Sequence, residues 1–225
     1  MKQILFVGQY DKTDLLFYLA KVLSQSKKVL IADYSGGRYE FAFPKIEMDS
    51  DLQEYDGFDV RENLKDYDSL QALLQESSYD IVLIDQERSE TLKKWPAADH
   101  YYLVSSYDNP TMMQNVRLIH SFFEDKPVAE LFTFRKILYE VHDTNNETFI
   151  NDLMEKYPIH WEESLTYYPD ERDLTLKIKN QFSNSVRMKG LSRPYKDVIK
   201  TIVSDILEIS LKETITMMKQ IERRN

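Results

Sequence analysis

The sequence predicts an α/β fold in three layers: a mostly parallel, twisted sheet with helices on both faces. Two observations lead to this fold class. Short continuous apolar runs, typical of strands buried on both faces, alternate along the chain with segments of helical periodicity. The 225 residues are 42% hydrophobic and 30% charged, as in an ordinary globular protein. No linker or low-complexity segment interrupts the pattern, so we expect a single domain over residues 1–225.

Apolar runs predict the strands of the sheet. Five longer strands are expected at QILFV (3–7), KVLIADY (28–34), YDIVLIDQE (79–87), DHYYLVSSY (99–107) and PVAELFTF (127–134). Two shorter ones are expected at GFDV (57–60) and PIHW (158–161). Because helical segments separate the longer runs, right-handed crossovers with parallel pairing are favoured.

Helical periodicity predicts the elements between the strands. In the first helical segment, Leu15, Leu19, Val22 and Leu23 recur on one face. A later segment opens with Asn109 and a first-turn proline, a common helix start. The expected helices are 13–25, 64–77, 109–124, 147–157, 170–182 and a long C-terminal helix at about 194–223.

Composition narrows the classes of function. The formal net charge of −9 argues against a general nucleic-acid-binding surface. The chain has no cysteine, which excludes disulfides and Cys-based zinc sites, and its four histidines lack metal-ligand spacing. No stretch approaches the roughly 18 apolar residues of a membrane span. We therefore expect a cytoplasmic location.

The loop after the first strand is a candidate phosphate-binding loop. In LFVGQYDKT, a glycine at position 8 is followed by Lys12 and Thr13 at the start of a helical segment. In such loops the lysine neutralises phosphate charge and the Ser/Thr hydroxyl ligates magnesium. The residue before the lysine is normally glycine, but here it is Asp11, whose carboxylate would repel phosphate.

Two aspartates end neighbouring predicted strands on the same edge as this loop. Asp33 ends the second strand and Asp85 ends the third. Ligands of parallel sheets bind at this edge, and a magnesium–ATP site uses carboxylates to orient water and to hold the metal. A lone strand-end aspartate more commonly caps a loop, and this alternative applies to both residues.

These residues resemble the motifs of the MinD/ParA family, the deviant-Walker P-loop ATPases of the SIMIBI class. The resemblance is carried in order by VGQYDKT, FYLAKVL, KVLIADYS and YDIVLID, and it extends to the closing segments YPDERDL and RPYKDVIK. It implies a P-loop NTPase-like fold. It also implies that Gly8, Lys12 and Thr13 hold phosphate, that Thr13 and Asp85 hold Mg²⁺, and that Asp33 is catalytic if the chain is an ATPase.

Departures from the family pattern imply a degenerate loop. The family's signature lysine is replaced by Val7, the glycine before the catalytic lysine by Asp11, and the second glycine by Gln9. The segment LFTFRK also lacks the asparagine that reads adenine. The leading interpretation is a protein without efficient ATPase chemistry and without a cofactor. It would act as a scaffold or regulatory binding partner in a cell-envelope-associated assembly such as a division, pilus or secretion machine.

Two alternatives remain open. The first is a slow Mg-ATPase that uses ATP and Mg²⁺ to position a partner. The second is a membrane-associated adaptor, because the chain end carries Met217, Met218 and Ile221 beside Arg223 and Arg224, as an amphipathic basic helix on anionic lipid would. That helix would place the chain at the inner face of the cell membrane; the competing interpretation is a helix packed on the sheet. In all cases we expect a protein partner, as a homodimer or as a heterodimer with a related ATPase.

Overall fold

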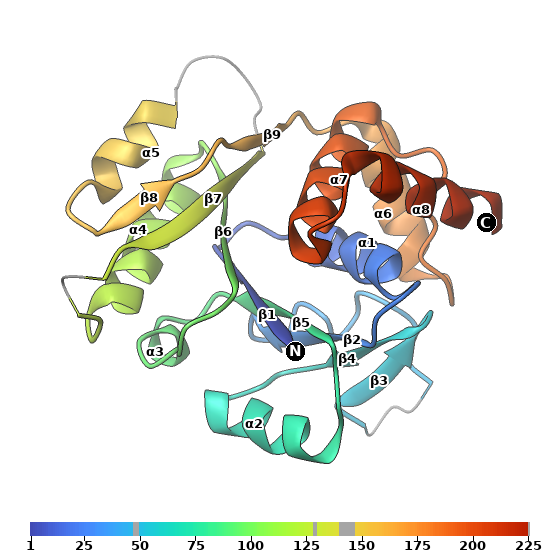
Figure 1. Ribbon diagram of the computed structural model, residues 1–225, viewed down its shortest axis with the longest axis horizontal. Helices are drawn as coiled ribbons and strands as arrows, with labels where there is room; N and C mark the ends of the chain where they lie inside the picture. Colours follow the sequence, from blue (N-terminus) through green and yellow to red (C-terminus); the bar gives the residue numbers. More distant parts are fainter. Residues whose placement is uncertain (47–49, 128–129, 140–146, 225) are drawn as a thin grey trace.

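The computed structural model describes residues 1–46, 50–127, 130–139 and 147–224, and its central feature is a nine-stranded sheet (Figure 1). The strands are β1 (Lys2–Val7), β2 (Val29–Tyr34), β3 (Leu52–Tyr55), β4 (Phe58–Arg61), β5 (Ile81–Gln86), β6 (His100–Ser106), β7 (Phe132–Tyr139), β8 (Ile159–Trp161) and β9 (Leu165–Tyr167). The helices are α1 (Thr13–Leu23), α2 (Tyr67–Glu76), α3 (Ser89–Leu92), α4 (Asn109–Phe123), α5 (Glu147–Met154), α6 (Glu171–Gln181), α7 (Arg193–Leu207) and α8 (Leu211–Arg224). The predicted α/β fold class is confirmed.

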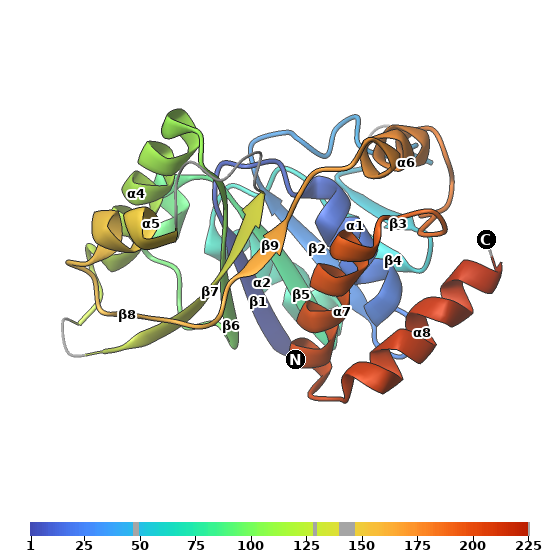
Figure 2. The ribbon, with the colours of Figure 1, turned by 90° about the horizontal axis from the view of Figure 1, so that it is seen from above.

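The strand order is β3-β4-β2-β5-β1-β6-β7-β8, and β9 also pairs with β7. Every pairing is parallel except that of the β3–β4 hairpin. The carboxyl ends of β1, β2 and β5 lie on the same side, at the top of the view in Figure 2. The loop that precedes α1 lies at this edge of the sheet.

The core consists of two apolar layers, one on each face of the sheet. Side chains alternate along β1, so that Ile4 and Phe6 pack with α1 and α7 while Leu5 and Val7 pack with the layer under α4. Both layers include buried residues from β2 and β5. The central strands are therefore buried on both faces, which explains their continuous apolar sequences.

The fifth predicted strand, 127–134, is wrong in its bounds. The structure has this strand as β7, Phe132–Tyr139, and residues 128–129 lie outside the described part. The strand continues through Lys136, which lies opposite Leu103 of β6, and the buried Lys136 ammonium lies 2.5 Å from Glu147 and 2.7 Å from Asn151. The segment LFTFRK therefore lies before the end of β7 at Tyr139. Residues 140–146, which follow β7, lie outside the described part. The absence of an adenine-reading asparagine stays a prediction.

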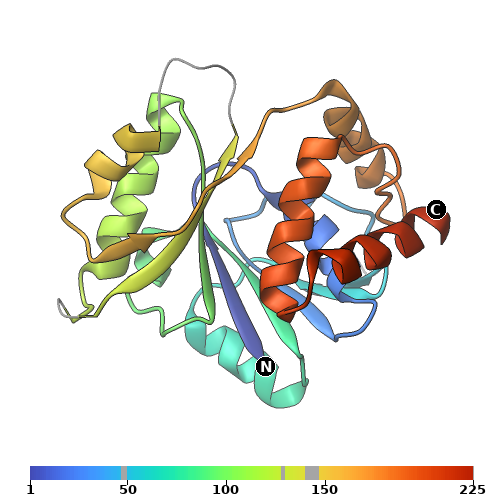
Figure 3. The same ribbon diagram turned by 45° about the horizontal axis from the view of Figure 1, so that its top comes forward.

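The single C-terminal helix predicted at 194–223 is two helices. α7 ends at Leu207, the following Glu208 adopts a left-handed conformation with φ 55°, and α8 leaves in a different direction (Figure 3). Ser210 and Glu213 then form a capping box: the Glu213 carboxylate accepts from Ser210 N at 2.9 Å, and Ser210 Oγ accepts from Glu213 N at 3.3 Å. The short elements β3, α3 and β9 were not predicted.

α8 packs against the body of the protein. Met218 and Ile221 belong to the same buried cluster as the apolar residues of α1 and α7, and Gln25, two residues after α1, donates to the Met217 carbonyl at 3.1 Å. Among the described residues, none of the helices is long and apolar enough to cross a membrane.

Candidate functional site

The carboxyl edge of the sheet brings all the sequence-predicted site residues together. Gly8 follows β1, and Lys12 and Thr13 stand at the start of α1. Asp33 on β2 lies opposite Asp85 on β5 in the strand register, so their side chains share the face that α1 covers. These residues therefore lie at one edge of the sheet, and their contacts define what this edge can do.

Lys12 is fully buried inside the protein. Its Nζ lies 2.5 Å from Asp85 Oδ1 and 3.1 Å from Glu87 Oε1, and it donates to the Gly8 carbonyl at 2.7 Å. Burial alone would lower the pKa of Lys12, but the two carboxylates overcome this effect and raise its pKa above the usual value. Lys12 is a charged ammonium that the chain itself neutralises.

Arg38 completes a four-residue ion-pair cluster, which we call the Lys12 cluster (Lys12, Asp85, Glu87 and Arg38). Arg38 Nε donates to both Glu87 carboxylate oxygens, at 2.8 and 2.9 Å. Burial raises the pKa of Asp85; Lys12 opposes that rise and Glu87 adds to it. Tyr39 donates its hydroxyl to Asp85 Oδ2 at 3.0 Å. Cations and carboxylates are equal in number in the cluster, so its charge is balanced without a ligand.

The Asp11 carboxylate occupies the N-terminus of α1. Its Oδ1 accepts from Thr13 N at 3.1 Å and from Thr13 Oγ1 at 2.7 Å, and its Oδ2 accepts from Lys177 Nζ at 2.7 Å. Burial alone would raise the pKa of Asp11, but Lys177 and these hydrogen bonds hold it well below its usual range. Helix N-termini favour anions, and here the chain supplies the anion.

Gly8 is required by the packing of the sheet. It has φ +143°, and a Cβ at this position would lie 2.1 Å from the Val104 carbonyl oxygen of β6. The neighbouring Gln9 N–H is used by Asn115 Oδ1 at 2.9 Å. Val7, where the family has its signature lysine, ends β1 as a fully buried side chain. Close backbone approach therefore explains this glycine without a phosphate.

Asp33 holds the loop that follows its own strand. Its Oδ1 accepts from Ser35 N at 2.7 Å and from Ser35 Oγ at 2.5 Å, and its Oδ2 accepts from Asn63 N at 3.0 Å. Both carboxylate oxygens are thus engaged by protein donors. This geometry matches the loop-capping alternative for a strand-end aspartate.

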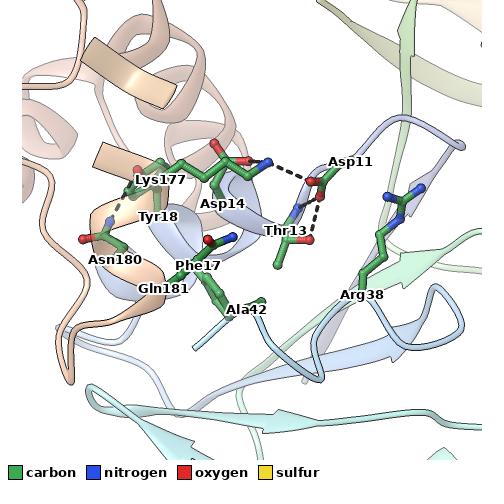
Figure 4. Close-up of a pocket in the computed structure, with 10 residues that line it drawn as sticks. All are labelled: Asp11, Thr13, Asp14, Phe17, Tyr18, Arg38, Ala42, Lys177, Asn180 and Gln181. Carbon is green, nitrogen blue, oxygen red and sulfur yellow. Dashed lines mark hydrogen bonds and ion pairs between the residues drawn. The ribbon is translucent and has the colours of Figure 1, made fainter. Parts of the chain in front are cut away.

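A cavity of about 240 Å³ lies beside the loop, between α1 and α6 (Figure 4). Small-molecule sites usually enclose about 300–1,000 Å³, so this cavity is small for a nucleotide. Its polar wall is formed by Asp11, Asp14, Lys177 and Arg38, and Figure 4 shows Lys177 reaching toward Asp11.

Sequence reasoning missed three residues of the site. Glu87 could have been recognised, since it follows Asp85 by two positions at the same strand end. Arg38 and Lys177 come from a loop and a distant helix, and no local pattern marks them.

The arrangement leaves magnesium and phosphate without their usual partners. The Thr13 hydroxyl is bonded to Asp11, and Asp85 is paired with Lys12. Within the described ranges, no group of three or more histidine, cysteine, aspartate or glutamate side chains could hold a metal ion. The residues, as arranged, do not fit Mg-ATP.

The mostly parallel sheet and the position of the loop before α1 define a MinD/ParA-like, P-loop NTPase-like α/β fold. No protein-family model matches the chain, and no curated protein matches it either. Among solved structures, apo McdA from Cyanthece is similar with a TM-score of 0.51 and 14% identity, over 96% of this chain and 99% of that chain. The MinD cell division protein of Aquifex aeolicus gives a TM-score of 0.52 and 12% identity, over 80% and 87%. A ParA family ATPase from Chlorobium tepidum TLS gives 0.49 and 14%, over 80% and 90%. At these identities the similarity shows the fold alone.

Proposed function

We propose that this chain is a MinD/ParA-type protein without nucleotide chemistry, which acts as a scaffold or regulatory binding partner of another protein. One observation carries the proposal: Lys12, the residue that would neutralise phosphate, is fully buried and paired with Asp85 and Glu87. An incoming phosphate would have to break these ion pairs and would leave buried carboxylates unpaired. Such a break costs about 3–5 kcal/mol.

The second support is the Asp11 carboxylate at the N-terminus of α1. A phosphate in the same place would meet a like charge and would have to displace the hydrogen bonds from Thr13. Leaving a buried donor or acceptor unpaired costs about 1–3 kcal/mol. Together with the ion pairs, these costs amount to about 4–8 kcal/mol, which is as much as the whole binding free energy of a millimolar to micromolar ligand.

The proposed setting is a protein assembly at the inner face of the cell envelope, with the chain in the cytoplasm. The similar MinD structure is described as a cell division protein, which supports an assembly of that kind. The partner would be a protein, either a second copy of this chain or a related ATPase. An ATP-bridged dimer of the family type would lack its bridging lysine, because Val7 is buried at that position.

Thermal unfolding with Mg-ATP tests the proposal. A site present at about 100 times its Kd would stabilise the fold by about 2.7 kcal/mol. For a chain of this size, that corresponds to a Tm increase of about 5–11 °C. We expect no increase. An increase that disappears in Lys12→Met would overturn the proposal and favour the slow Mg-ATPase. A nucleotide-binding P-loop ATPase measured in parallel is the positive control.

A further inference from the structure

The segment 174–196 is a basic block in an acidic chain. It contains six Lys or Arg residues and no Asp or Glu, whereas the whole chain has a formal net charge of −9. The remainder of the chain therefore carries −15. The cations of the block are Lys177, Lys179, Arg187, Lys189, Arg193 and Lys196.

Part of this basic charge has no partner within the protein. Lys177 pairs with Asp11, and Lys196 pairs with Glu222 at 2.6 Å. In contrast, Lys179, Arg187 and Lys189 are exposed, and no carboxylate of a described residue forms an ion pair with them. Unpaired exposed cations that are close together produce a local positive potential.

An apolar stripe lies beside these cations on α6. Leu174, Ile178 and Phe182 recur every four residues and are 58%, 48% and 83% exposed. Spacing of four places Leu174 and Ile178 on one face of α6, and Phe182 is the residue directly after the helix end. The opposite face, with Leu176 and Asn180, is buried. In Figure 2, α6 lies at the outer margin of the molecule.

A basic groove runs along one side of the stripe. A cavity of about 400 Å³ lies between α6 and the turn at 189–190, and its walls include Arg172, Lys179 and Lys189. Glu171 also lines it, and Arg172 is bonded to Asp170. We call the stripe and the groove together the α6 surface (Leu174, Ile178, Phe182, Arg172, Lys179 and Lys189).

The α6 surface is held in place by its neighbours. Asn180 Oδ1 accepts from Arg187 N at 3.1 Å, and Asn180 Nδ2 donates to the Arg187 carbonyl at 3.0 Å. Tyr55 donates its hydroxyl to the Ser183 carbonyl at 2.9 Å. A preformed surface loses little conformational freedom on binding, so its contacts contribute fully to affinity.

We propose that the α6 surface binds an acidic amphipathic helical segment of a protein partner. Apolar residues of that segment would cover Leu174, Ile178 and Phe182, as in helix-in-groove recognition. Its carboxylates would face Lys179 and Lys189. This inference deepens the proposed function, on which it rests, by naming the chemistry of the partner.

Charge and shape favour this occupant over other anions. DNA would gain nothing from covering three apolar side chains. DNA and an anionic bilayer are also extended and would face the −15 of the remaining chain. A short segment meets mainly the local charge, because salt screens charges beyond about 8–10 Å.

Fluorescence anisotropy with a labelled model peptide tests the inference. The probe is an 18-residue helical peptide. Its leucines are spaced alternately three and four residues apart and so form one face of the helix, its glutamates flank that face, and the remaining positions are alanine. We expect saturable binding to the full chain. Because truncating an anchor residue costs at least about 1.4 kcal/mol, Leu174→Ser and Lys189→Glu should each weaken binding about tenfold or more.

Matched variants and probes make the result decisive. Leu131→Ser and Lys94→Glu change an exposed leucine and an exposed lysine elsewhere, and they should bind the peptide like the wild type. A peptide with lysine in place of glutamate should not bind.

The inference is overturned if the acidic peptide does not bind. It is also overturned if Leu174→Ser binds unchanged, or if only phosphatidylglycerol vesicles or duplex DNA bind the α6 surface. Thermal unfolding in the presence of Mg-ATP is a separate measurement. Nucleotide binding together with peptide binding would therefore refute the proposed function and leave this inference standing.

Discussion

Replacing Lys12 by methionine should destabilise the fold strongly. The ammonium is fully buried between Asp85 and Glu87, whose side chains are 0% and 4% exposed. Removing one partner of such a buried pair costs about 3–5 kcal/mol. For a chain of 225 residues, 1 kcal/mol shifts Tm by about 2–4 °C, so Lys12→Met should lower Tm by about 6–20 °C.

Urea unfolding followed by tryptophan fluorescence measures this loss, since the chain has two tryptophans, Trp95 and Trp161. Lys94→Met is the control, because Lys94 is exposed, and it should stay within about 0.5 kcal/mol of the wild type. Adding Asp85→Asn to Lys12→Met should recover part of the loss, since it removes the orphaned carboxylate while Glu87 keeps Arg38.

The pH dependence provides a second readout. Burial raises the pKa of Asp85, and Lys12 opposes that rise. Without Lys12, the Asp85 carboxyl is therefore more readily neutral at low pH, so the loss should be smaller at pH 5 than at pH 8. If Lys12→Met unfolds within about 0.5 kcal/mol of the wild type at both pH values, the ammonium does not lie in a buried ion pair and the reasoning fails.

Three further predictions concern the loop and the last helix. Gly8→Ala should destabilise the fold far more than Gly37→Ala in urea unfolding, because both have positive φ but only the first places a Cβ against backbone; equal losses would contradict this. Asp11→Asn should lose stability at neutral pH. The deficit in unfolding free energy relative to the wild type should shrink as the pH falls below the ordinary Asp pKa of about 3.9 toward the lowered pKa of Asp11, because the wild-type carboxylate then becomes protonated. A deficit that does not change with pH would contradict this prediction. Deleting residues 210–225 should lower Tm and leave flotation with anionic liposomes unchanged; flotation that depends on this segment would support the membrane adaptor instead.

The sequence predicted the sheet well because its central strands are buried on both faces and read as continuous apolar runs. It failed at β7, where Lys136 is buried by partners that a local pattern does not show. The break between α7 and α8 was signalled by Ser210 and Glu213, a capping-box spacing within an otherwise helical periodicity.

The candidate site was predicted in position but not in contacts. The loop residues and Asp85 converge as the parallel topology requires. Whether Lys12 faces a ligand or a carboxylate depends on Glu87 and on Arg38, which comes from a loop without a recognisable motif. Asp11 was expected only to repel phosphate, and Lys177, which pairs with it, lies 166 positions along the chain.

The Lys12 cluster also limits how such a sequence changes over generations. It ties the loop before α1 to the end of β5 and to the loop around Arg38. A single substitution toward an open anion-binding loop would remove a stabilising contact before any ligand could replace it. Only coordinated exchanges at Asp11, Lys12 and Glu87 would avoid an unstable intermediate, and the marginal stability of proteins makes such intermediates costly. We therefore expect the residues of this loop and their ion-pair partners to be substituted together and not one at a time.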